Sequence, residues 1–175
     1  MPKLVTVLKP EKIDEQARYY VRSHILLPAG TIGLVCMVGG VGALAYQLLA
    51  NHTYSWVTFL SSSLLIVAGA GCGFAQARYH RYLFKTFPEV YAAKMRMAVA
   101  QRNRKAKAKT EPEAPAIEHP GRGFVTAISI AGAVLVFGSS AVAYMYGNLD
   151  LFPSIVVPWA GFYWAKLFCW RGVVD

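Results

Sequence analysis

Long apolar stretches broken by short polar turns dominate this sequence. No Asp, Glu, Lys or Arg occurs in residues 23–77 or in residues 123–149. A helix needs roughly 20 apolar residues to cross a hydrocarbon layer about 30 Å thick, so the first stretch is long enough for two crossings. A polar cluster at residues 51–53 divides it into segments 25–50 and 54–77. We therefore expect a helical hairpin in this half of the chain.

The second half of the chain has the same arrangement. Residues 124–146 and 151–170 are apolar, and residues 147–150 form a polar break between them. Within lipid every backbone N–H and C=O group needs an internal partner, which a helix supplies from its own segment. The alternating apolar and polar residues of a membrane β-barrel are missing here. The predicted fold is therefore all-α: an integral membrane protein with four transmembrane helices arranged as two hairpins, plus short interfacial helices.

Composition divides the chain into four parts. These are an N-terminal interfacial segment, transmembrane hairpin 1, a basic surface helix with a flexible linker, and transmembrane hairpin 2, at residues 1–24, 25–85, 86–122 and 123–175. Pro10 is expected to start the interfacial helix, because proline suits the first position of a helix. Pro88 likewise marks a break followed by a surface helix over residues 88–104. The linker after this helix is rich in Lys, Pro and Glu and has little to bury.

The positive charge of the chain lies on one side of this arrangement. The sequence has 18 Lys and Arg against 9 Asp and Glu, for a formal net charge of +9. The Lys and Arg residues all precede residue 23, lie within residues 78–122, or are Lys166 and Arg171. The positive-inside rule then places both termini on the cytoplasmic side of a bacterial inner membrane, or on the matrix side of a mitochondrial inner membrane. Topology and anionic lipid thus explain the basicity without nucleic acid.

Small residues at helical spacing indicate where helices pack in lipid, because they let two backbones approach closely. Gly69 and Gly73 form the clearest such pair, and the first and third spans each carry another. The predicted helix-packing residues are Gly69, Gly73, Gly39, Ala43, Ser139 and Ala143. Contact within each hairpin is the favoured interpretation, and contact with another subunit is the alternative.

Two further groups of side chains are expected to face the surroundings of the protein. Arg78, Arg81 and Lys85 form a basic collar with aromatic neighbours at the end of the second span, which suits anionic phospholipid headgroups. The fourth span contains interior prolines, which free backbone carbonyls that neighbouring helices must satisfy. Its large rings are therefore predicted to contact a partner. The residues are Trp159, Tyr163 and Trp164.

The sequence contains no recognisable pattern for catalysis, phosphate binding or metal ligation, so we expect neither an enzyme nor a bound cofactor. The interior of each predicted span also lacks ionisable residues, which argues against active transport. The favoured hypothesis is a structural or accessory subunit of a larger membrane protein complex. It would belong to an energy-transducing complex, respiratory or photosynthetic, as in an electron transport chain. It would pack at the periphery against other membrane subunits and lipid.

Three alternatives stay open. In the first, the chain forms a small homo-oligomeric channel or facilitator in which residues 61–63 and Gln47 face a shared path. In the second, His24 and His80, both near the inner face, hold a haem, although interfacial histidines are the commoner interpretation. In the third, the chain binds or organises lipid through the basic collar at residues 78–85.

Overall fold

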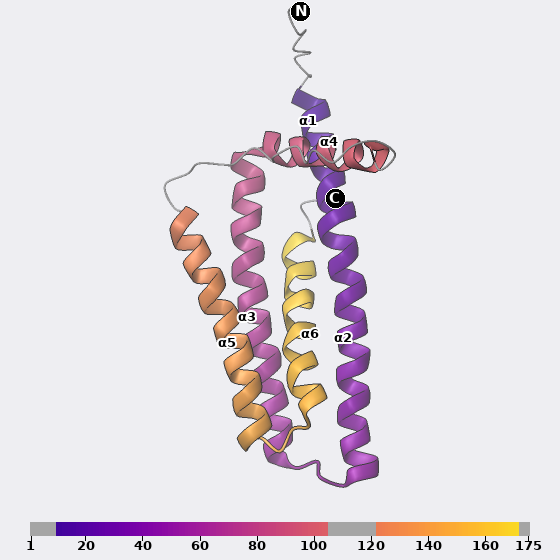
Figure 1. Cartoon of the computed structure of the whole chain (residues 1–175), viewed down its shortest axis with the longest axis vertical. Helices are drawn as coiled ribbons and strands as arrows, with labels where there is room; N and C mark the ends of the chain where they lie inside the picture. Colours follow the sequence, from indigo (N-terminus) through magenta and orange to yellow (C-terminus); the bar gives the residue numbers. More distant parts are fainter. Residues whose placement is uncertain (1–9, 105–121, 172–175) are drawn as a thin grey trace, which may run out of the picture.

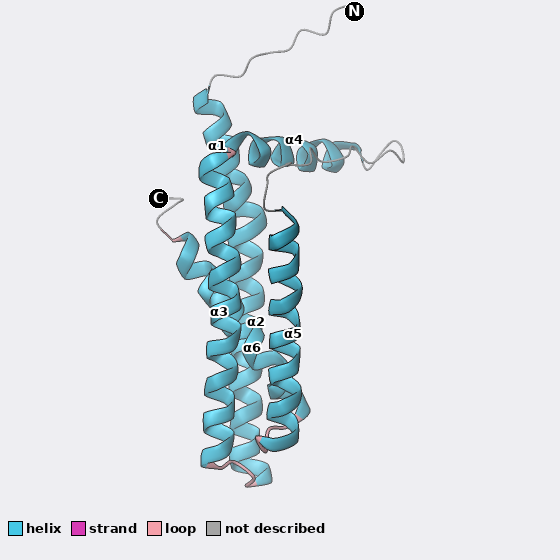
Figure 2. Cartoon of the chain, turned by 90° about the vertical axis from the view of Figure 1, so that its left-hand side faces the viewer, coloured by secondary structure: helices cyan, strands magenta, loops and turns pink. Residues whose placement is uncertain are grey.

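The computed structural model describes residues 10–104 and 122–171, which are helical apart from short connections and contain no strand (Figure 1, Figure 2). The predicted all-α fold is confirmed for this part of the chain. Two π-helical turns, η1 and η2, interrupt the α-helices. In chain order the elements are α1 (Pro10–Tyr20), η1 (Val21–Leu26), α2 (Leu27–Tyr46), η2 (Gln47–Asn51), α3 (Trp56–Thr86), α4 (Pro88–Arg104), α5 (Arg122–Tyr146) and α6 (Leu151–Trp170).

Three helices in the described part of the chain are long and apolar enough to cross a membrane. They are Ile13–Asn51 with 39 residues, Trp56–Thr86 with 31 and Ser129–Tyr146 with 18. The first runs without a break from α1 through η1 and α2 to η2. Helix α6 is not among the three, and it contains two prolines, several large polar rings and Lys166. Three candidate crossings are therefore observed where the sequence predicts four.

Helix α6 lies between α2 and α3 (Figure 1). Its most extensive contact is with α3 and its next is with α2, while α5 packs against α3 and more lightly against α6. A short turn joins α2 to α3, yet α6 is the main packing neighbour of both. The closest helix contacts thus join opposite halves of the chain, whereas the sequence pattern favoured contacts within each hairpin.

Helix α4 runs across one end of the bundle and packs against α1 (Figure 1, Figure 2). Helix α3 ends at Thr86, and the N–H of Phe87 donates to the Leu83 carbonyl at 2.8 Å. Pro88 then begins α4, where its missing N–H removes no helical hydrogen bond. Helix α4 covers the residues predicted to form a surface helix. The predicted linker after it lies outside the described residues.

Both short turns occur where the polar clusters predict them. His52 follows η2 and Asn148 follows α5, and each adopts a left-handed backbone conformation, with φ of 53° and 50°. Ser55 begins α3 with a capping box, in which its hydroxyl accepts from the Thr58 N–H while its own N–H donates to the Thr58 hydroxyl. These bonds satisfy backbone donors that the first turn of a helix leaves without partners.

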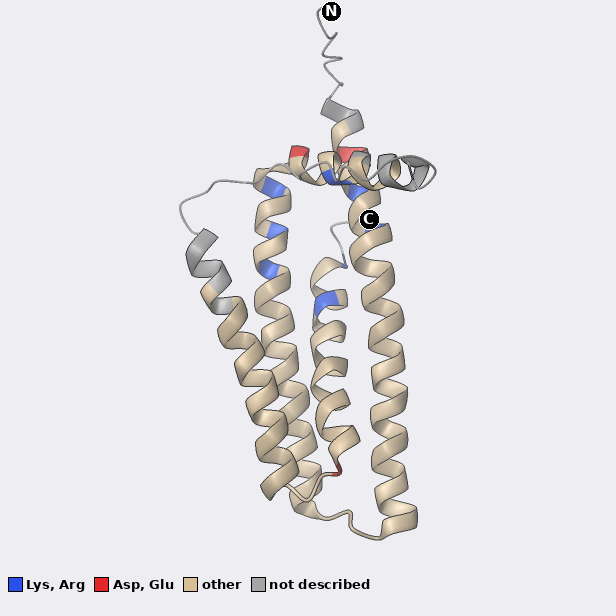
Figure 3. Cartoon of the chain, viewed as in Figure 1, with Lys and Arg blue, Asp and Glu red and all other residues tan. Residues whose placement is uncertain are grey.

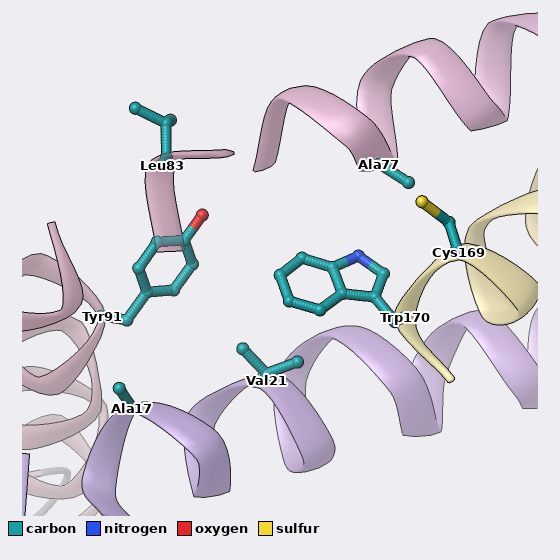
Figure 4. Packing of buried hydrophobic residues seen from close by; sticks show 7 residues of the cluster. All are labelled: Ala17, Val21, Ala77, Leu83, Tyr91, Cys169 and Trp170. Carbon is teal, nitrogen blue, oxygen red and sulfur yellow. The ribbon is translucent and has the colours of Figure 1, made fainter. Parts of the chain in front are cut away.

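Two clusters of buried apolar residues hold the helices together. The larger one lies at the end of the bundle beside α4, where Trp170 is 0% exposed and packs among α1, α3 and α4 (Figure 4). Its other members are Ala17, Val21, Ala77, Leu83, Tyr91 and Cys169. The smaller cluster consists of Leu65, Ala143, Leu149 and Val157. Because large aromatic rings bury much apolar area, the Trp170 cluster is expected to anchor the C-terminal end of α6.

Candidate functional site

Lys and Arg gather at the end of the bundle where α1 and α4 meet the ends of α3 and α6, which we call the charged end (Figure 3). Asp150 lies at the opposite end, in the turn before α6. Neither short turn carries a Lys or Arg. The helices therefore have one strongly cationic end and one end without cations, and the charged end is the candidate site.

Arg81 connects α3 to α6 at the charged end. Its Nη1 atom donates to the carbonyl oxygen of Cys169 at 2.7 Å. The last carbonyls of a helix have no partner within it and carry partial negative charge, so a guanidinium group is well suited to this position. Arg78 and Lys85 are exposed. Of the three residues predicted to meet headgroups, two therefore face outward and Arg81 has an internal partner.

Lys166 is half-buried one helical turn before the end of α6. Its Nζ atom donates to Oε1 of Gln76 on α3 at 3.1 Å and lies 5.4 Å from the centroid of the Phe162 ring. An ammonium over an aromatic face gains a cation–π interaction. Both partners are uncharged, so the positive charge of Lys166 is oriented but not neutralised by them.

Tyr91 of α4 sits against His80 of α3. The Tyr91 hydroxyl donates to the His80 carbonyl oxygen at 3.2 Å and lies 3.4 Å from Nδ1 of the same residue. Tyr91 is 3% exposed, and burial, with smaller contributions from Tyr20 and Tyr79, raises its pKa to about 12. The hydroxyl therefore stays protonated near neutral pH and remains a hydrogen-bond donor. Lys94 lies over the same ring, with Nζ 5.6 Å from its centroid.

The two histidines considered as haem ligands each interact with a tyrosine. His24 is exposed and stacks on Tyr20 with ring centroids 4.8 Å apart, and its Nδ1 is 2.7 Å from the Ser23 hydroxyl. His80 is held by Tyr91, whose ring meets that of Tyr20 edge to face. Within the described residues no group of three or more His, Cys, Asp or Glu could hold a metal ion.

The glycine pair of α3 faces α6. A Cβ added at Gly69 would collide with the Pro158 carbonyl, and one added at Gly73 would collide with the Phe162 carbonyl. On the other side of this contact, a Cβ at Gly161 would collide with the Ile66 carbonyl. Glycine is thus required on both helices at their closest approach. The sequence analysis identified the α3 pair but not Gly161, although Ala165 lies four residues after it at the spacing typical of small-residue packing faces.

Small residues also face α6 from α2. A Cβ at Gly39 would meet Phe152 and Val156 at ordinary van der Waals distances of 3.8 to 3.9 Å. Gly33 and Gly40 approach α6 more closely, since a Cβ would lie 3.0 Å from Tyr163 and 3.2 Å from Val157, respectively. These two glycines were missed in the sequence, although their spacing of seven residues places them on one helix face.

The remaining predicted packing residues lie in different surroundings. Ala43 is half-buried on α2, and Ala143 of α5 is buried in the smaller cluster with Leu65. The Ser139 hydroxyl donates to the Val136 carbonyl of its own helix at 2.9 Å. Ser139 is therefore satisfied locally, as hydroxyls in apolar helices commonly are.

The aromatic residues predicted to contact a partner are divided between the protein interior and its surface. Trp159 meets Phe137 of α5 edge to face, with ring centroids 6.1 Å apart. Tyr163 packs against Gly33 of α2. Trp164 is 37% exposed. All three thus have neighbours within this chain, since Trp164 also lies near Gly33, and Trp164 is the most exposed of them.

The end opposite the charged end contains a buried polar network. The carbonyl oxygen of Asn148 accepts from Nε2 of Gln47 at 3.2 Å and from the Thr58 hydroxyl at 3.4 Å. Gln47 is 1% exposed, and its Oε1 atom has no hydrogen-bond partner among the described residues. This network connects the turn before α6 to η2 and α3, and it places Gln47 inside the bundle.

The described residues thus define an all-α protein with three helices able to cross a membrane and with its cations gathered at one end. Comparison of this chain with protein-family models, with curated proteins and with solved structures finds no match. The function is therefore argued from the residues of the bundle and its charged end.

Proposed function

We propose that this chain is a structural or accessory subunit of a larger membrane assembly. The observation that carries the proposal is the amount of apolar helix surface that the chain does not pack against itself. In the most apolar window of Ile13–Asn51, and equally in that of Ser129–Tyr146, only 17% of the residues are buried. Lipid and neighbouring subunits are the surroundings that such surfaces fit.

We further propose that α6 is a fourth crossing. It lies alongside α2 and α3 and shares their close glycine contacts, so it belongs to the same apolar layer as they do. Asp150 precedes it and Arg171 follows it. Its prolines and rings lower its hydropathy, but α2 and α3 cover much of it from either side, which reduces its need to be apolar toward lipid. The charged end would then face the cytoplasm or the matrix.

The bonding of the interior hydroxyls favours a subunit over a channel. Ser62 is buried and its hydroxyl donates to the Phe59 carbonyl of its own helix at 2.9 Å. Ser140 and Ser154 bond within their own helices in the same way. Gln47, the other residue proposed for a shared path, is buried against Asn148. Two of the residues proposed for a shared path, Ser62 and Gln47, are therefore turned inward within a single copy, and Ser61 and Ser63 are half-buried.

Native mass measurement after extraction in a mild detergent tests the proposal. Unlike membrane subunits bound in fixed stoichiometry are the expected result. A stable lone monomer would contradict the subunit proposal, and a ring of identical copies would support the channel instead.

Labelling of single cysteines tests the crossing at α6. In a background with the native cysteines replaced by serine, Asp150→Cys and Arg171→Cys would be exposed to an impermeant maleimide in sealed vesicles. Labelling from opposite sides is expected. Labelling of both cysteines from one side would exclude a crossing at α6. The control is the pair Thr53→Cys and Lys85→Cys, which flanks the candidate crossing α3 in the same way.

A further inference from the structure

The long first helix changes its hydrogen-bonding pattern at the charged end. Between α1 and α2 it forms the π turn η1, in which the N–H of Leu27 donates to the carbonyl of Arg22, five residues earlier. The bonds of an α-helix span only four residues, so a π turn contains about one residue more than an α-turn. The π turn therefore changes the rotation of α1 about the helix axis relative to α2.

The buried residues on both sides of this change face the same neighbour, α6. On α2, Gly33 and Gly40 are buried toward α6, and a Cβ added at Gly33 would lie 3.0 Å from Tyr163. Val21, the first residue of η1, is buried in one cluster with Trp170 at the end of α6 (Figure 4). The helix thus presents one continuous buried side to α6, from Val21 to Gly40.

The π turn brings these buried residues into line. In an uninterrupted α-helix, Gly33 and Gly40 would lie about 120° and about 100° around the axis from Val21, since each residue turns the helix by about 100°. The additional residue in η1 removes about 100° of this difference, so the three residues come to lie within about 20° of one another. Without the π turn, Val21 and the two glycines would not face α6 together.

The rotation of α1 in turn determines whether α4 can dock, because α1 is the main packing neighbour of α4. Ala17 of α1 lies in the same buried cluster as Tyr91 of α4, and the Tyr20 ring meets the Tyr91 ring edge to face, with centroids 6.1 Å apart. Ala92, the next residue of α4, is 0% exposed. A rotation of α1 by one residue, or about 100°, would turn Ala17 and Tyr20 away from α4.

Both local and tertiary features favour the π form of η1. Pro28 lies at the start of α2. In an α-helix a proline ring clashes with the carbonyl four residues earlier, which here belongs to His24 of η1, so Pro28 disfavours a regular α-turn at this position. The packing of Val21 against Trp170 also favours the π form. Because π turns are rare without such support, loss of these features should return η1 to an α-turn.

We propose that η1 is a conformational switch that controls the docking of α4. In the π form, α1 holds α4 across the charged end. Conversion of η1 to an α-turn rotates α1 by about 100° and releases α4 from the bundle. The switch lies within one chain and requires neither a partner subunit nor a particular side of a membrane. Its test is therefore independent of the test of the proposed function.

Maleimide labelling of a cysteine at position 92 measures whether α4 is docked in the detergent-purified chain. In a background with the three native cysteines replaced by serine, Ala92→Cys should react slowly, because residue 92 is buried. Adding Pro28→Ala should accelerate this labelling about tenfold, since its rate follows the population in which α4 is released. Deletion of Ser23 from the Pro28→Ala protein should restore slow labelling, because an α-turn then contains the number of residues that aligns α1 with α2.

The matched control is deletion of Tyr19, which shortens the same helix by one residue outside η1. In the Pro28→Ala protein this deletion should leave the labelling fast, because Tyr20 and Val21 keep the rotated position. Equal labelling rates at position 92 after the two deletions would overturn the proposal. Slow labelling in the Pro28→Ala protein itself would overturn it as well.

A second variant tests the switch with Pro28 in place. An alanine inserted after Ser23 rotates α1 by about a further 100° and should also accelerate the labelling at position 92. Unchanged labelling in this variant would show that the docking of α4 does not depend on the rotation of α1. Val99→Cys, at an exposed position of α4, should react equally fast in all these proteins, and circular dichroism with gel filtration checks that each one folds.

Discussion

Gly161 of α6 lies directly against the main-chain carbonyl of Ile66 on α3, leaving no space for a side chain between the two helices. Gly69 of α3 has the same relation to the carbonyl of Pro158 on α6. Two helices this close exchange backbone van der Waals contacts and Cα–H···O interactions that larger residues prevent. This contact therefore acts together with the buried Trp170 cluster in holding α6 against α3.

Gly161→Ala should destabilise the bundle by about 1 to 3 kcal/mol, because the added methyl group meets backbone atoms that cannot move aside without separating α3 from α6. Thermal unfolding in detergent, followed by circular dichroism, measures the effect. Gly71→Ala is the control, since a Cβ there meets nothing within 4 Å. If both variants unfold at the same temperature, the glycine contact is not what limits the stability of the bundle.

Arg81→Gln should loosen the C-terminal end of α6, because the Cys169 carbonyl loses a charged donor at 2.7 Å. A loss of about 1 to 2 kcal/mol is expected for a partly exposed bond of this type. Hydrogen exchange of the last turn of α6 reports the loosening directly. Arg78→Gln removes an exposed charge from the same helix and should leave that exchange unchanged. Equal exchange in the two variants would show that the Arg81 bond does not stabilise this helix end.

Gln47→Leu and Thr58→Val should be strongly non-additive. Each single change leaves the Asn148 carbonyl with one of its two donors, and Thr58→Val also removes the acceptor of the Ser55 N–H in the capping box. Gln47→Leu should therefore cost less than about 1 kcal/mol, and Thr58→Val about 1 to 2 kcal/mol. The double variant removes both donors, and its loss should exceed the sum of the single losses by at least about 0.5 kcal/mol. Chemical unfolding of the four proteins in a double-mutant cycle measures this excess. A purely additive result would show that the two donors do not share the stabilisation of this turn.

Because Tyr91 is buried, we predict that the stability of the fold decreases at alkaline pH. Its pKa is raised from 10 to about 12, so the fold favours the neutral phenol. The resulting stabilisation is complete below about pH 10 and is lost as pH rises toward 12. The thermal midpoint of the wild type should therefore fall more between pH 10 and 12 than that of Tyr91→Phe. The control is Tyr82→Phe, which changes an exposed ring and should show the same pH dependence as the wild type. If the thermal midpoints of all three proteins fall equally between pH 10 and 12, the prediction for the buried Tyr91 phenol is wrong.

The positions of the helix ends could be predicted from local chemistry. Pro88 interrupts the helix that precedes it, and the polar clusters at residues 51–53 and 147–150 cannot lie in lipid without partners. The described helices begin and end at these positions. The gathering of Lys and Arg at one end of the bundle could also be predicted from local chemistry, because dehydrating an ammonium or guanidinium group is unfavourable wherever it occurs in the chain.

Local sequence is enough to predict that the chain forms apolar helices, where they end and which end carries the cations, because these properties depend on each segment alone. The folded chain is needed to see that α6 lies between α2 and α3, that Gly161 completes the contact begun by Gly69, and that Arg81 bonds to Cys169. Those relations join residues far apart in the chain. Small residues at helical spacing indicate which face of a helix packs, but the choice of the neighbouring helix depends on close shape fit and on single polar contacts, which no segment specifies by itself.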